Sequence, residues 1–85
     1  MGDFDKPLDY RKLSETRLVH KAEKAARLSI MVVADGEHQR VEAWFPLSQL
    51  REANNGYLAS TWIIKKKEEE LADANNWGEV AIQVD

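Results

Sequence analysis

A predicted β-hairpin in the middle of the chain is the feature that most constrains its fold. Every even-numbered residue from 26 to 32 is apolar, and so is every odd-numbered residue from 41 to 45. Such alternation places the apolar side chains on one face of each strand. Asp35-Gly36 lies between the two runs, and this pair tolerates the positive φ angles of a two-residue hairpin turn. We therefore predict two antiparallel strands that share an apolar face. The second should end at Pro46, which cannot donate a ladder hydrogen bond.

Two interpretations fit the segment before the hairpin. Residues 15–20 alternate as a first strand, and residues 21–24 then form a polar connection without glycine. The competing interpretation makes residues 14–28 one helix capped by Ser14, because Ala, Glu, Lys, Arg and Leu favour helices. We take the strand as the working prediction and leave the helix open as its alternative.

The segment after the hairpin predicts a short strand, a helix and a last strand. Residues 57–59 form the short strand, and a helix capped by Ser60 or Thr61 then extends to Ala74. Residues 79–84 alternate again as a strand. The predicted fold class is therefore α+β, with a small, barrel-like antiparallel sheet of four to five strands and one helix packed on it.

A chain of 85 residues suits one domain with a small core. Residues 1–12 show little periodicity, so we expect a mobile N-terminal tail followed by a single α+β domain over residues 13–85.

Trp44 falls on the polar face of its strand, where burial beneath the helix is the commoner outcome for a tryptophan and exposure as a contact residue is the alternative. The predicted core consists of Leu18, Leu28, Ile30, Val32, Val41, Ala43, Phe45, Ile64, Leu71, Val80 and Ile82.

The residue types that catalysis and metal binding need are scarce. The chain has no cysteine, so it offers no thiolate nucleophile, zinc ligand or disulfide. His20 and His38 are expected at opposite ends of the sheet, which argues against one shared site. Glu68, Glu69 and Glu70 are consecutive on the helix and point in different directions. We therefore predict a non-enzymatic protein without metal or cofactor. The lack of cysteine and of an apolar run of about 18–20 residues also predicts a cytoplasmic protein that does not enter the membrane.

Charge is distributed unevenly along the chain, although the net charge is only −3. Basic side chains outnumber acidic ones over residues 11–27, and all charged side chains over residues 68–85 are acidic. Such asymmetry can steer a charged partner, or both regions can be ordinary solvated surface.

Binding of single-stranded nucleic acid by a basic β-hairpin is one functional hypothesis. Lysine and arginine can contact phosphates while Trp44 or Tyr57 stacks on a base. The sequence pI of 5.4 argues against this hypothesis, because nucleic-acid-binding domains are usually basic. The candidate nucleic-acid-binding residues are Arg17, Lys21, Lys24, Arg27 and Arg40.

Several positions within residues 15–72 give the chain a resemblance to known proteins. They are the Glu-Lys-Ala turn at 23–25, the Trp-x-Pro-x-Ser-Gln segment at 44–49, and Trp62 at the start of the helix. With these residues the chain resembles small proteins of phages and other bacterial mobile elements. The lysine usual between Pro and Ser in that group is Leu47 here, which weakens the expectation of a charged contact at this position.

The resemblance implies a function by fold-level analogy, because the group has no activity that can be carried over. Accessory proteins of this size are often inhibitors of host defence, such as anti-CRISPR proteins. The implied function is stoichiometric binding of a protein partner, for example a CRISPR-type defence complex, without catalytic residues. A homodimer is compatible with this size, since sheet edges can pair. The candidate partner-binding residues are Trp44, Gln49, Trp62, Glu68, Glu69, Glu70 and Asp73.

Overall fold

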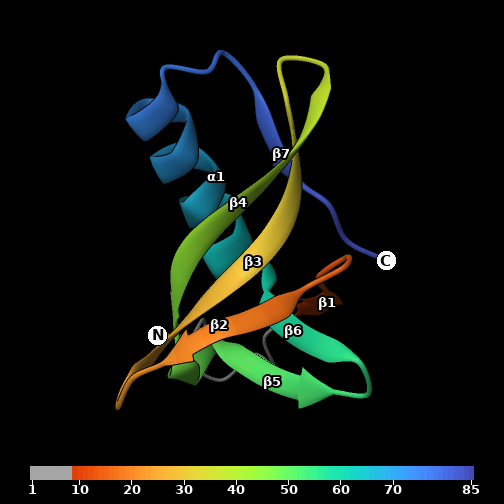
Figure 1. The fold of residues 1–85 in the computed structure, drawn as a ribbon, viewed down its shortest axis with the longest axis vertical. Helices are drawn as coiled ribbons and strands as arrows, with labels where there is room; N and C mark the ends of the chain where they lie inside the picture. Colours follow the sequence, from red (N-terminus) through yellow and green to blue (C-terminus); the bar gives the residue numbers. More distant parts are fainter. Residues whose placement is uncertain (1–8) are drawn as a thin grey trace, which may run out of the picture.

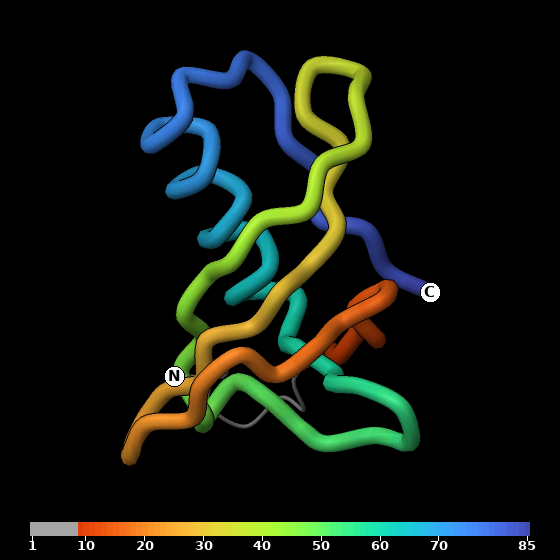
Figure 2. The backbone as a smooth tube through the Cα atoms, in the orientation of Figure 1, coloured from red at the N-terminus to blue at the C-terminus, as the bar shows by residue number. Residues whose placement is uncertain are grey.

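The computed structural model describes residues 9–85, which form two antiparallel sheets and one α-helix. The predicted α+β class is confirmed, although the described residues hold seven strands where four to five were expected. Figure 1 shows the larger sheet in front of the helix, and Figure 2 shows the path of the backbone. The elements are β1 (Tyr10–Lys12), β2 (Arg17–Lys21), β3 (Ala25–Ala34), β4 (Glu37–Pro46), the 3₁₀ helix η2 (Leu47–Gln49), β5 (Leu50–Ala53), β6 (Gly56–Ser60), α1 (Thr61–Asn75) and β7 (Val80–Ile82).

The strand β3 is the centre of the larger sheet. It pairs with β4 along its whole length, and its other side is divided between β2 near its start and β7 near its end. The turn residues Asp35 and Gly36 have φ angles of 50° and 86°, as a type I′ turn requires. The predicted hairpin is therefore confirmed, and the competing helix over residues 14–28 is wrong because that segment holds β2 and the start of β3.

The smaller sheet places β6 between β1 and β5. The Arg51 guanidinium lies 5.0 Å from the ring centroid of Tyr10, so a cation–π contact joins β5 to β1 across β6. The sequence predicted neither of these two outer strands. β1 lies within the expected tail of residues 1–12, of which residues 1–8 are outside the described part of the chain.

The core lies between the two sheets and α1. Leu28, Ile30 and Val32 of β3 are fully buried together with Phe45 of β4, as the alternation predicted. The prediction for Leu18 is wrong, because this side chain is 45% exposed. All five residues of β2 are exposed, so the core does not extend beneath this short strand.

The helix α1 begins and ends where the sequence indicated. Ser60 is the N-cap, and its hydroxyl accepts a hydrogen bond from the backbone nitrogen of Ile63 at 3.1 Å. Asn76 ends the helix in the left-handed conformation, with φ of 56°. In its first turn Ile63 and Ile64 are buried in the core, whereas Trp62 is 57% exposed.

Candidate partner-binding face

One face of the larger sheet packs on the core, and we call the opposite face the outer face. In antiparallel strands, residues directly opposite each other lie on the same face. The register pairs Arg27 with Trp44 and with His20, and it pairs Ser29 with Glu42 and with Arg17. The helix and the smaller sheet contribute their buried side chains to the core side instead. The outer face includes Arg17, His20, Arg27, Ser29, Arg40, Glu42 and Trp44.

Trp44 is the large aromatic residue of the outer face. Its side chain is 42% exposed, and its ring meets that of His20 edge to face with the centroids 5.9 Å apart. The expectation that the later helix covers Trp44 is wrong, because α1 packs against the core side of the sheet. An exposed tryptophan beside another aromatic ring is suited to contact with a partner.

Two arginines of this face are held by neighbouring groups. Arg27 forms an ion pair with Glu42, with Nη2 and Oε1 2.9 Å apart. Arg40 donates from Nη1 to the carbonyl oxygen of Glu15 at 3.0 Å and to the hydroxyl of Ser29 at 2.9 Å. Ion pairs this exposed add about 0–1 kcal/mol to stability. Their main effect is therefore to fix two guanidinium groups on the same face as Trp44.

The candidate nucleic-acid residues are only partly brought together. Arg17, Arg27 and Arg40 share the outer face. Lys21 pairs with the buried Ala26 and lines a cavity of about 210 Å³ on the core side. Lys24 lies in the connection between β2 and β3. Three of the five candidates therefore form one group with Trp44.

Two of the candidate partner-binding residues lie at the start of α1. The side-chain oxygen of Gln49 accepts a hydrogen bond from the hydroxyl of Ser60, so Gln49 orients the N-cap of the helix. Trp62 is exposed, with the ammonium group of Lys66 5.6 Å from its ring centroid. Because Trp62 is on α1, the core separates it from the outer face that holds Trp44.

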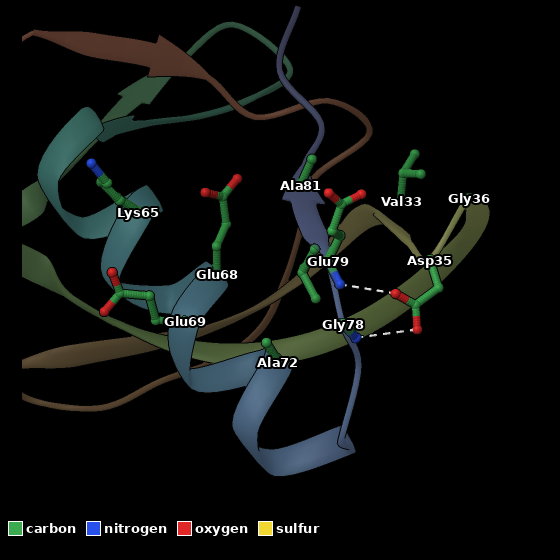
Figure 3. Close-up of a pocket in the computed structure, with 11 residues that line it drawn as sticks. Val33, Asp35, Gly36, Lys65, Glu68, Glu69, Ala72, Gly78, Glu79 and Ala81 are labelled. Carbon is green, nitrogen blue, oxygen red and sulfur yellow. Dashed lines mark hydrogen bonds between the residues drawn. The ribbon is translucent and has the colours of Figure 1, made fainter.

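The acidic candidates line and flank a separate cavity of about 560 Å³ between α1, β7 and the tip of the β3–β4 hairpin (Figure 3). Glu68 accepts a hydrogen bond from the backbone nitrogen of Ile82 at 2.8 Å, and this contact attaches β7 to α1. Glu69 lines the cavity. Glu70 pairs with Lys67 at 3.0 Å, and Asp73 is exposed nearer the end of the helix.

Asp35, at the hairpin tip, also has a structural role in this cavity. Its carboxylate accepts hydrogen bonds from the backbone nitrogens of Gly78 at 3.2 Å and Glu79 at 2.9 Å, as the dashed lines in Figure 3 show. The connection between α1 and β7 is thereby attached to the hairpin. Glu68 and Asp35 are thus both engaged by backbone N–H groups of the C-terminal segment.

Sequence reasoning did not name three residues of the outer face, His20, Ser29 and Glu42. In a regular strand His20 would share the face of Leu18, but a β-bulge between them moves His20 to the outer face. Glu42 was on the polar face of its strand, yet its partner Arg27 becomes apparent only from the register. The strand period could have indicated Glu42, whereas no local signal indicated the bulge.

Within residues 9–85 no group of three or more His, Asp or Glu side chains is arranged to hold a metal ion. No helix of this part of the chain is long and apolar enough to cross a membrane. Comparisons with protein-family models, curated proteins and solved structures gave no match.

Proposed function

We propose that this protein binds another protein through the outer face and acts stoichiometrically, without catalysis. The observation that carries the proposal is Trp44, which is 42% exposed on a sheet face where Arg27 and Arg40 are already held in place. Tryptophan and arginine are the residues most enriched among those that dominate binding energy at protein interfaces. Side chains that are ordered before binding lose less conformational entropy when the partner arrives.

The charge of the outer face supports a protein partner over a polyanion. Glu42 lies among the arginines and neutralises Arg27, so the face presents both signs of charge. A phosphate backbone approaching Arg27 would meet a carboxylate at the same position. Val19 of β2, at the bulge, is 44% exposed and adds apolar surface at the neighbouring edge.

For the partner we propose a host-defence complex. The resemblance of residues 15–72 to phage and mobile-element proteins suggests a host-defence complex, which the protein would block by occupying its surface. The proposal of binding through Trp44 does not depend on that choice.

Site-specific photo-crosslinking tests the proposed face. A photoreactive phenylalanine analogue replaces Trp44 in one variant and Trp62 in the matched control, since both positions are exposed. In host lysate we expect a defined adduct from position 44, absent from position 62. Excess unmodified protein should suppress this adduct, and a Trp44→Ala competitor should not. Equal labelling from both positions, or equal competition by Trp44→Ala, contradicts the proposal.

Single-stranded nucleic acid is a second candidate ligand for the same face. The observation in its favour is that Arg17, Arg27 and Arg40 lie on one face with the aromatic pair of Trp44 and His20. Arginines can contact phosphates while an aromatic ring stacks on a base.

An oligonucleotide titration distinguishes the two ligands. Labelled single- and double-stranded oligonucleotides are titrated at low and at physiological salt. Affinity that falls steeply with salt and is lost in Trp44→Ala would favour nucleic acid as the ligand. The absence of binding at low salt would eliminate this candidate and leave the protein partner.

A further inference from the structure

The strand β4 has one edge that pairs with β3 and one that bonds to no other described strand. In a hairpin closed by a two-residue type I′ turn, alternate residues point their N–H and C=O groups toward the neighbour strand and away from it. Odd-numbered residues of β3 bond away from β4, as Met31 does in accepting from the backbone nitrogen of Gln83. The backbone N–H and C=O groups of their partners on β4 therefore point away from β3, toward the unpaired edge. We call these partners the outward-pointing residues. The outward-pointing residues of β4 are His38, Arg40, Glu42 and Trp44.

We propose that a second copy of this chain pairs with this edge, antiparallel, about a two-fold axis at Val41. In that register Arg40 lies opposite the partner subunit's Glu42, and Glu42 lies opposite the partner subunit's Arg40. His38 lies opposite the partner subunit's Trp44. All four outward-pointing residues pair in this arrangement, which forms about eight backbone hydrogen bonds.

Charge selects this register over its neighbours. Only register shifts by an even number of residues keep the outward-pointing backbone groups paired. A register shift of two residues moves the two-fold axis by one residue. Shifting the axis to residue 40 places Arg40 opposite its own copy, and shifting it to residue 42 does the same for Glu42. Like charges directly opposite each other are destabilising, whereas opposite charges are favourable. The axis at Val41 replaces both repulsions with two attractive pairs.

The edge carries few of the features that usually prevent such pairing. Proteins protect long edges with bulges, with prolines, with a covering helix or loop, or with charged side chains, above all lysines on the edge and charges that point inward. β4 is ten residues long, its register with β3 has no bulge, and its only proline is Pro46 at its end. Of its three charged residues, Arg40 and Glu42 lie on the outer face, where they do not obstruct an added strand, and Glu37 lies at its start beside the turn.

The dimer would change the partner-binding face. A two-fold axis perpendicular to the sheet joins the two four-stranded sheets into one sheet of eight strands, with both outer faces on the same side. The ion pair of Arg27 with Glu42 would extend to the partner subunit's Arg40. Each Trp44 would gain the partner subunit's His38 as a neighbour. This inference is independent of the ligand that the outer face takes.

Charge reversal tests the register. Arg40→Glu places two acids opposite each other, and Glu42→Arg places two bases opposite each other. By sedimentation equilibrium we expect each variant alone to raise the dimer dissociation constant at least about tenfold. An equimolar mixture of the two variants should form a heterodimer, and the double variant R40E/E42R should restore the homodimer. Circular dichroism checks that each variant is folded.

Disulfide trapping provides a second measurement that does not depend on charge. The chain has no cysteine, so a single introduced thiol reports one contact. At the axis, two copies of residue 41 form a non-hydrogen-bonded pair with Cα atoms about 4.5 Å apart, within the range for a disulfide. Val41→Cys should oxidise to a covalent dimer, and the control Ala43→Cys should not.

Three results would contradict the dimer or its register. A wild-type protein that sediments as a monomer at millimolar concentration overturns it. A dimer that Val41→Cys does not trap, or whose single charge variants fail to recombine, overturns the register and places the contact elsewhere. A protein-partner adduct at Trp44 from a strictly monomeric protein would leave the proposed function intact while the dimer is rejected.

Discussion

The two faces of the β3–β4 hairpin differ although they are built by the same alternation. On the core side Leu28, Ile30 and Phe45 are completely buried. On the outer face Trp44 is exposed and Arg27 is ion-paired at the surface. Core side chains contribute to stability by leaving water, whereas the outer side chains remain available to a ligand. Substitutions should therefore separate into those that unfold the protein and those that only weaken binding.

The largest effect is expected on the core side, from Ile30→Ala. Removing buried methyl and methylene groups from a close-packed core lowers the free energy of unfolding by about 2–5 kcal/mol. Ile30→Val, the matched control, should lower it by about 0.5–1.5 kcal/mol. Urea denaturation followed by circular dichroism measures both. A loss below about 1 kcal/mol for Ile30→Ala would mean that the two faces do not differ in the way described.

Ser60→Ala tests the polar contact that joins the core to α1. The variant removes the N-cap hydrogen bond to Ile63 and leaves Gln49 without its partner. We expect a loss of about 1–2 kcal/mol in the free energy of unfolding. Thr61→Ala, at the neighbouring exposed position, should change it by about 0.5 kcal/mol or less. Equal losses for the two variants would remove the special role of Ser60.

Trp44→Ala tests the outer face, where stability and binding should separate. The edge-to-face contact with His20 and the partial burial of the ring account for a loss of about 1 kcal/mol or less in the free energy of unfolding. The same variant should lose the crosslinking competition described above. A stability loss as large as that of Ile30→Ala would show instead that Trp44 is part of the structural core.

The smallest effect is expected from Asp85→Asn, and it depends on pH. Hydrogen bonds from Lys12 and then Ser14 lower the pKa of Asp85 in the folded protein. A lowered pKa stabilises the fold above the unfolded-state pKa of about 3.9, and this stabilisation is lost as the pH falls through the folded value. Wild-type protein should therefore melt slightly above Asp85→Asn at pH 7. A melting-temperature difference that persists unchanged in acid would contradict this assignment.

Local chemistry explains which parts of the fold could be predicted. The Asp35-Gly36 turn and the Ser60 cap act within a few residues, and both were found from the sequence. β1 and β5 were missed because each is recognisable only through β6. Tyr10, for example, pairs with Ser60, which lies 50 positions later in the chain (60 − 10). Short strands without clear alternation carry no local sign of such a distant neighbour.

The sequence named several residues of the candidate site, but it did not predict how they are arranged. The strand period correctly placed Trp44 on the face opposite Phe45, but it could not indicate which face α1 would cover. The same limit applies to Leu18, whose strand lies beyond the core. The acidic residues of α1 were grouped because they are close in sequence. In the structure the carboxylate of Glu68 accepts a hydrogen bond from the backbone of β7, so it has a structural role.

The edge of β3 that faces away from β4 pairs with β2 near its start and with β7 near its end. This arrangement has a consequence for the order in which the protein folds. The β3–β4 ladder closes across two residues, whereas Val32 pairs with Ile82 only after 50 residues are brought together (82 − 32). Loop-closure entropy makes the first contact fast and the second slow. We therefore expect the hairpin to form early and β7 to complete the larger sheet last. We also expect β7 to detach first in the native state, which would open one end of β3 while its ladder with β4 stays intact.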